Sequence, residues 1–176
     1  MKKLFSEIPY IKGKTIVMRE IRQEDAPGLK ELTESETVYR YLPTFLFEKK
    51  YDDVSDVISR LYDECLEESL ILGIFMDDRF CGLEELYGYR DDLHKISIGS
   101  RLMEWCWGKG VASEALELIV DYLLNETDIE IITASSMVEN KASARVLSSH
   151  GFERVAHDVP EDWGFEKPRQ VDKWIR

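Results

Sequence analysis

The stretch from Trp105 to Asn125 constrains the fold most, because two glycines lead straight into an amphipathic helical pattern. Gly108 and Gly110 allow φ values that a side chain disfavours, and they let a ligand approach the backbone closely. Successive N–H groups at a helix start, where the macrodipole is positive, can bind a phosphate group. The stretch therefore predicts a phosphate-binding turn between a strand and a helix. The expected buried stripe of that helix is Ala112, Ala115, Leu116, Ile119 and Leu123.

Length and composition predict one globular domain covering residues 1–176. Hydrophobic residues make up 44% of the chain and charged residues 33%, which is typical of a folded soluble protein. The net charge of −12 disfavours nonspecific binding to nucleic acid or to an anionic membrane. An acidic surface favours the approach of a cationic substrate such as an amine.

The cysteines and the apolar runs indicate a cytoplasmic protein. Cys65, Cys81 and Cys106 are widely spaced and lie in no Cys-x-x-Cys pattern, so we expect reduced thiols and no metal site. No apolar signal-peptide region follows the N-terminal lysines. The strongest apolar run, Leu70 to Met76, is too short to span a bilayer.

The hydrophobic pattern predicts a mixed α/β fold in which three adjacent strands form an antiparallel meander. A later strand, Ile129 to Ala134, is apolar on both faces and is expected in the centre of the sheet. Asp158 to Pro168 is expected to be a polar loop. The other expected strands are Thr15–Ile21, Ser69–Met76, Arg79–Tyr87, Lys95–Met103, Phe152–His157 and Val171–Ile175. Helices are expected from Asp25 to about Leu32, over Val38–Leu42, from Asp53 to Cys65, after Gly110 and from Asn140 to Gly151.

Two nucleotide-binding motifs with similar glycines do not match the turn. A Walker A loop needs Ser or Thr after Gly-Lys, whereas Gly110 follows Lys109 here. A dinucleotide fingerprint needs glycine where Ser113 stands, and it follows a parallel βαβ start rather than a meander.

The sequence Trp-Gly-Lys-Gly-Val-Ala at 107–112, followed by Ser-Glu-Ala, resembles the acyl-CoA pyrophosphate loop of the GNAT superfamily of N-acetyltransferases. The resemblance is to its ribosomal-protein N-terminal acetyltransferase branch. Asn-Lys-Ala-Ser at 140–143 and His-Gly-Phe at 150–152 are similar to the next helix and strand of that branch. Met18 to Leu32 looks like its first strand and helix. This resemblance implies an α/β (α+β) fold with a mostly antiparallel sheet, flanked by helices and splayed between two central strands where acetyl-CoA binds.

The resemblance also implies the donor site. The loop amides would bind the pyrophosphate of acetyl-CoA, and the backbone near Met103 would pair with the pantetheine arm like an added strand. Asn140 would cap its helix and hydrogen-bond to the same arm. Lys109 supplies positive charge or is a solvated loop lysine. The expected cofactor-binding residues are Arg101, Leu102, Met103, Trp107, Gly108, Lys109, Gly110, Val111, Ala112, Asn140 and Ser143.

The implied reaction is direct attack of a neutral amine on the thioester, which requires a base and an acid. Many family members place a tyrosine acid where Leu147 stands here, and the branch that this chain resembles has a serine at Ser143. Ser143 is therefore the candidate acid, with a solvent-facing polar role as the alternative. The candidate bases are Glu84, Glu85 and Glu104, and His157 is a further option. His94 and His150 read as structural or exposed.

The sequence does not identify the amine acceptor. A protein N-terminus, a polyamine, an amino acid or an aminoglycoside-like amine are all compatible, and Tyr39, Tyr41 and Trp163 either line the acceptor groove or belong to the core. A non-catalytic acyl-CoA-binding module is the alternative function, because the usual tyrosine is missing. The expected partners are acetyl-CoA and an amine, and the sequence allows a homodimer.

Overall fold

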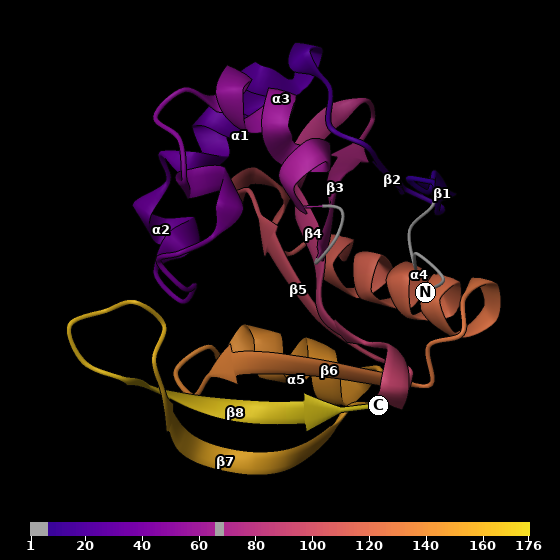
Figure 1. The fold of residues 1–176 in the computed structure, drawn as a ribbon, viewed down its shortest axis with the longest axis vertical. Helices are drawn as coiled ribbons and strands as arrows, with labels where there is room; N and C mark the ends of the chain where they lie inside the picture. The colour runs from indigo at the N-terminus through magenta and orange to yellow at the C-terminus, as the bar shows by residue number, and fades with distance from the viewer. Residues whose placement is uncertain (1–6, 66–68) are drawn as a thin grey trace.

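The computed structural model describes residues 7–65 and 69–176 and places eight strands in one sheet (Figure 1). The strand order across the sheet is β1-β2-β3-β4-β5-β6-β8-β7. The strands are β1 (Ile11–Lys12), β2 (Ile16–Arg19), β3 (Ser69–Met76), β4 (Arg79–Arg90), β5 (Lys95–Leu102), β6 (Ile131–Met137), β7 (Glu153–Glu161) and β8 (Arg169–Ile175).

The sheet is antiparallel except where β5 meets β6. These two strands pair only from Lys95–Ile131 to Ile98–Ala134, so the remainder of each strand has no partner on that side. The expected splay between two central strands is confirmed, and β6 lies inside the sheet as its apolar faces predicted.

Five α-helices cover the sheet: α1 (Ala26–Thr33), α2 (Glu36–Tyr39), α3 (Val54–Cys65), α4 (Val111–Glu126) and α5 (Lys141–Ser149). Figure 1 shows α1, α2 and α3 gathered at one end of the molecule, while α5 lies beside β6 and β8. The α3 face formed by Val57, Ile58 and Leu61 is buried as its spacing predicted, and the Cys65 side chain lies outside the described residues. No helix in the described ranges is long and apolar enough to cross a bilayer.

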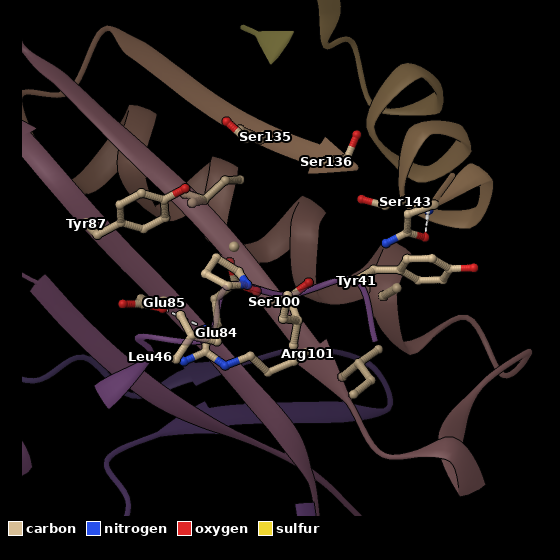
Figure 2. A pocket seen from close by; sticks show the side chains of 18 of the residues that line it. Tyr41, Leu46, Glu84, Glu85, Tyr87, Ser100, Arg101, Ser135, Ser136 and Ser143 are labelled. Carbon is tan, nitrogen blue, oxygen red and sulfur yellow. Dashed lines mark hydrogen bonds and ion pairs between the residues drawn. The ribbon is translucent and has the colours of Figure 1, made fainter. Parts of the chain in front are cut away.

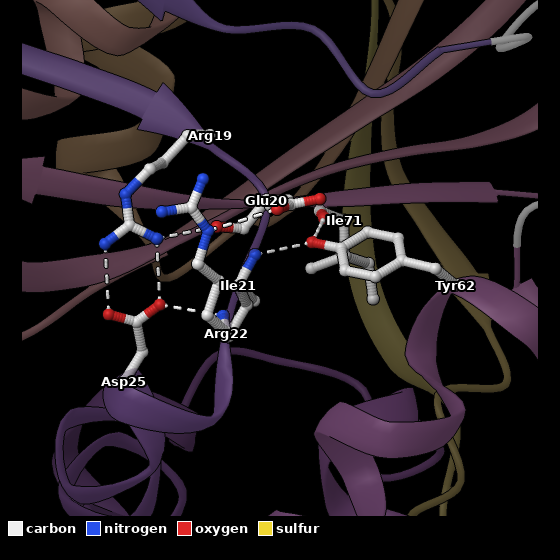
Figure 3. Close-up of polar contacts among 7 residues, drawn as sticks. All are labelled: Arg19, Glu20, Ile21, Arg22, Asp25, Tyr62 and Ile71. Carbon is white, nitrogen blue, oxygen red and sulfur yellow. Dashed lines mark hydrogen bonds and ion pairs between the residues drawn. The ribbon is translucent and has the colours of Figure 1, made fainter.

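Polar contacts join β2 and the residues after it to the helices α1 and α3 (Figure 3). The Arg19 guanidinium pairs with Asp25 at 2.9 Å, and this contact holds the end of β2 against the start of α1. The Tyr62 hydroxyl accepts from the Ile21 amide at 2.7 Å and donates to the Ile71 carbonyl at 3.0 Å. Because Tyr62 belongs to α3, these bonds fasten that helix to the sheet.

Several strand boundaries differ from the prediction: β2 is shorter, β4 continues to Arg90, β6 ends at Met137 and β8 begins at Arg169. β6 begins at Ile131 rather than Ile129, and the amides of Glu130 and Ile131 both donate to the His94 carbonyl just before the pairing with β5. β7 continues through Glu161, which pairs with Arg169, so the expected loop at 158–168 is partly strand. Polar residues are tolerated there because β7 is an edge strand that faces solvent on one side.

Candidate active site

The glycine turn before α4 has the backbone geometry that its sequence predicted. Gly108 and Gly110 have φ of 72° and 79°, a region that side chains disfavour. Gly110 is the residue that caps α4, so the first amides of the helix follow directly. Lys109 is exposed, and its ammonium lies 5.1 Å from the centre of the Trp105 ring.

A cleft of about 1710 Å³ runs from this turn to the opening between β5 and β6. Its walls are the turn, the start of α4, the ends of β4, β5 and β6, the start of α5 and the segment after α2. The structure brings together most of the predicted site: Glu84, Glu85, Arg101, Leu102, Trp107, Gly108, Gly110, Val111, Ala112, Asn140 and Ser143. Of the predicted residues, Met103, Glu104 and Lys109 do not line it.

Glu104 and Met103 are held elsewhere by their own contacts. The exposed Glu104 carboxylate accepts from the Ser35 hydroxyl at 3.2 Å and borders a separate, smaller cavity of about 350 Å³. Met103 is buried, and its amide donates to the Cys81 carbonyl at 2.7 Å. Glu104 is therefore poorly placed as a base, and the Met103 amide has no free proton for a pantetheine arm.

The Leu102 carbonyl points away from β4, because a peptide unit directs its C=O opposite to the N–H that Met103 gives to Cys81. The Trp107 indole nitrogen donates to this carbonyl at 2.9 Å. Trp107 is 49% exposed and also lines the cleft. The Leu102 carbonyl is thus the backbone acceptor that faces the opening between β5 and β6. The indole of Trp107 covers this carbonyl.

Glu84 is the most perturbed carboxyl group of the cleft. Its side chain is 2% exposed, and its carboxylate forms no hydrogen bond or ion pair with the described residues. Burial, and after it the like charge of Glu85, raise the pKa of Glu84 well above its usual value, although Arg101 opposes the shift. A carboxylate that is buried, unpaired and open to a cleft is suited to accept a proton.

A second feature, the ion pairs of the buried Arg101 side chain, was not predicted from the sequence. The guanidinium contacts both Glu48 oxygens at 2.6 Å, and it contacts Glu85, which lies beside it in Figure 2, at 2.7 Å. Burial alone would raise the pKa of Glu48, but the Arg101 charge outweighs it and the pKa lies below its usual value. Glu85 is thus neutralised by Arg101, whereas Glu84 is not.

Asn140 and Ser143 lie at the start of α5, as predicted. The Asn140 side-chain oxygen accepts from the Ser143 amide at 3.2 Å, so the cap is confirmed. The amide group of Asn140 and the hydroxyl of Ser143 have no hydrogen-bond partner within the described ranges. Figure 2 shows Ser143 directed toward the end of β6, so both groups can donate to a ligand in the cleft.

The three histidines lie away from the cleft. His157 is exposed on β7 and contacts Asp172 at 2.6 Å, which argues against its role as a base. His94 and His150 each contact a backbone carbonyl at 2.8 Å, as expected for structural residues. Cys81 and Cys106 are buried free cysteines, as predicted, while Cys65 is outside the described side chains.

The wall opposite the turn is aromatic. Tyr41 and Trp163 line the cleft as predicted, whereas the Tyr39 hydroxyl donates to Glu48 at 2.8 Å and belongs to the Arg101 cluster. Tyr87, which the sequence did not single out, also lines the cleft with 37% of its surface exposed. The Thr44 amide donates to the Trp163 carbonyl at 2.9 Å, so two distant loops form this wall together.

The comparisons with known proteins agree with this geometry. A family model described as an acetyltransferase (GNAT) domain matches residues 15–153. The probable N-acetyltransferase YjcK of Bacillus subtilis is 33% identical over 151 residues, covering 82% of this chain and 83% of the relative. The fold is that of the ribosomal L7/L12 acetyltransferase RimL in complex with coenzyme A, with a TM-score of 0.82, 15% identity and coverage of 96% and 97%. The spermidine N-acetyltransferase of Vibrio cholerae gives a TM-score of 0.77, 18% identity and coverage of 93% and 96%.

Proposed function

The chain belongs to the GNAT family of acetyltransferases, and on that basis we propose how its cleft transfers an acetyl group to an amine. The protein is an N-acetyltransferase, with acetyl-CoA as its cosubstrate. One observation carries the proposal: the glycine turn that begins α4 opens on the same cleft as Glu84, which is buried and has no partner among the described residues. A site for the donor and a proton acceptor for the amine thus share one cavity.

The donor binds along the splay. The amides of Gly108 to Ala112 hold the pyrophosphate at the positive end of α4, whereas the Trp107 amide already donates to the Glu104 carbonyl at 3.1 Å. The pantetheine arm pairs with the free edge of β5 and donates a hydrogen bond to the Leu102 carbonyl. The Trp107 indole then either loses its own hydrogen bond to that carbonyl or donates to it together with the arm. The Asn140 amide, which has no partner in the described residues, donates to the same arm. The Lys109 ammonium contacts the pyrophosphate directly only if its side chain moves away from the Trp105 ring.

The reaction needs proton transfers at the amine and at the sulfur. Glu84 takes a proton from the entering ammonium, the neutral amine attacks the acetyl carbonyl carbon, and the bond from carbon to sulfur breaks as the carbonyl re-forms. The Ser143 hydroxyl gives its proton to the departing thiolate and regains one from the nitrogen of the new amide. Glu85 is a weaker candidate base than Glu84 because Arg101 neutralises it. Under this proposal, Ser143→Ala lowers kcat and leaves acetyl-CoA affinity unchanged, and an unchanged kcat would remove Ser143 from the mechanism.

The whole proposal is tested by incubating the protein with acetyl-CoA and a panel of amines, and by following thiol release with a thiol-reactive dye. The panel contains peptides with free N-termini, spermidine, amino acids and an aminoglycoside. Thiol release that depends on one acceptor class supports the proposal and identifies the acceptor. Acetyl-CoA binding without release across the panel favours a binding module instead, and no binding at all refutes the assignment of the cleft.

Gly110→Val is expected to weaken acetyl-CoA binding at least about 5-fold. A side chain at the φ of 79° costs roughly 1–2 kcal/mol, so the turn relaxes and its amides lose their alignment. An added Cβ meets no atom within 4 Å, so the effect comes from the backbone rather than from a clash. The measurement is titration calorimetry with acetyl-CoA.

Gly151→Val is the matched control for this variant. Gly151 has a φ of 80°, follows α5 and does not line the cleft, so it carries the same strain away from the donor site. Its affinity for acetyl-CoA should match that of the wild type. Equal affinities of the Gly110 and Gly151 variants would argue against the turn as the pyrophosphate site.

Three finer expectations belong to the same proposal. We propose that residues 1–176 form one domain, which a single cooperative unfolding transition would support. A cytoplasmic location fits the reduced cysteines and is tested by cell fractionation. A homodimer is tested by light scattering after size-exclusion chromatography, where a monomer mass would exclude it.

A further inference from the structure

Two neighbouring serines stand where the sheet opens. Ser135 and Ser136 of β6 follow directly after Ala134, which forms the last pair with β5. Both serines line the cleft (Figure 2), and strand geometry directs adjacent side chains to opposite faces of the sheet. Neither residue was singled out by the sequence.

Each serine oxygen accepts a hydrogen bond from a side chain of β8 that can only donate. The Lys173 ammonium donates to Ser135 at 3.0 Å, and the Trp174 indole nitrogen donates to Ser136 at 3.0 Å. Ammonium and indole N–H groups accept no hydrogen bond, so each serine must direct its own proton elsewhere. For Ser135, no partner for that proton is found within the described residues.

A salt-bridged ammonium group lies beside Ser135. Lys173 is directly opposite Ser135 in the register of β6 and β8, and its ammonium also pairs with Glu161. Glu161 in turn accepts from the Trp163 indole at 2.8 Å, so the ammonium is held from two sides. A hydroxyl that accepts from a cation is a stronger donor than one that accepts from a neutral indole. Ser135 is therefore the stronger donor of the two serines.

We propose that Ser135, polarised by Lys173, donates a hydrogen bond to the carbonyl oxygen of the acetyl thioester. This inference rests on the proposed function, in which the thioester lies in the opening that begins at Ser135. The carbonyl oxygen gains negative charge as the amine attacks, and a fixed donor there lowers the barrier. This role is separate from that of Glu84, which takes the proton of the amine, and from that of Ser143, which serves the sulfur.

The direct test is isotope-edited infrared spectroscopy of bound acetyl-CoA that carries carbon-13 at the acetyl carbonyl. A hydrogen bond to the oxygen lowers the stretching frequency of the carbonyl. Binding to the wild type is expected to lower this frequency relative to free acetyl-CoA, and Ser135→Ala is expected to reverse most of the shift. The matched control is Ser97→Ala, because Ser97 bonds to Thr133 at 2.8 Å deeper in the sheet and does not line the cleft.

Kinetics give the second readout, with any acceptor found active in the panel. Ser135→Ala should lower kcat by about 100-fold, the usual loss for one oxyanion donor, with the affinity for coenzyme A unchanged. Lys173→Gln should lower kcat less, and the double variant should be no worse than Ser135→Ala alone. Melting temperatures of all the variants separate a folding defect from a catalytic one.

The outcomes distinguish this inference from the proposed function. If the wild type does not bind acetyl-CoA, the proposed function fails and the inference fails with it. If the wild type binds but Ser135→Ala leaves the carbonyl frequency unchanged, the inference alone is overturned, even if the variant is slower. A rise in the KM of the amine with an unchanged frequency would assign Ser135 to the acceptor instead and would equally overturn the proposal.

Discussion

Glu84→Gln is expected to lower kcat by about 100- to 10,000-fold while acetyl-CoA binds as before, because the amide cannot accept the proton of the amine. In the wild type, activity should rise with pH through the pKa of Glu84, which lies well above the usual range for glutamate. The measurement is kcat/KM as a function of pH with one active acceptor. Loss of this rising limb in the residual activity of the variant would support the assignment.

The same substitution should stabilise the fold at neutral and alkaline pH. The pKa of Glu84 is raised in the folded state, so its favourable contribution exists below the unfolded pKa and is lost as pH rises through the folded pKa. Gln carries no charge at any pH, so the variant should melt at a higher temperature than the wild type above that pKa and at an equal temperature in acid. Scanning calorimetry across pH checks the sign.

Glu104→Gln provides the matched control. This variant makes the same change in an exposed carboxylate just after β5, which borders the smaller cavity and not the cleft. Its activity and its melting temperature should follow those of the wild type. If Glu104→Gln lost activity and Glu84→Gln did not, the assignment of the base would be wrong.

Arg101→Met is expected to destabilise the protein by about 3–5 kcal/mol, because it leaves Glu48 and Glu85 as uncompensated charges in the interior. For a chain of this length such a loss lowers the melting temperature by roughly 6–20 °C. The loss should be smaller in acid, since protonated carboxyl groups need no partner. Urea unfolding at several pH values measures it.

Two further variants test the cause. Lys30→Met breaks an exposed pair with Glu34 on α1 and should change stability by less than about 1 kcal/mol. Adding Glu48→Gln to Arg101→Met removes one of the two carboxylate charges that lose their partner, and it should restore part of the stability. Equal stabilities of Arg101→Met and the wild type would show that this cluster does not support the fold.

The donor half of the site could be predicted because its geometry is local. Positive φ at Gly108 and Gly110 follows from the residue type, and the Asn140 cap needs only the residues next to it. The paired strands on either side of Asp77-Asp78 were likewise evident from alternation and turn residues. Short-range rules were enough for these features.

The catalytic half could not be predicted to the same depth, because it depends on contacts between distant segments. Glu84 and Glu85 look alike in sequence, and only the position of Arg101 decides which one is neutralised. Glu48 reaches Arg101 across a separation of 53 residues, and no local pattern marks it. The bonds from β8 to Ser135 and Ser136 depend on a register that strand prediction cannot supply.

The backbone character of the turn before α4 affects how such an enzyme can diversify. If the donor is held mainly by main-chain amides, most side chains around it can change while the glycines keep the turn. The wall formed by Tyr41, Tyr87 and Trp163, by contrast, presents side chains to the cleft. If this wall binds the amine, as we propose, substitutions there should change the acceptor and leave acetyl-CoA binding intact, so a library restricted to these three positions is the shortest route to a transferase with a new amine substrate.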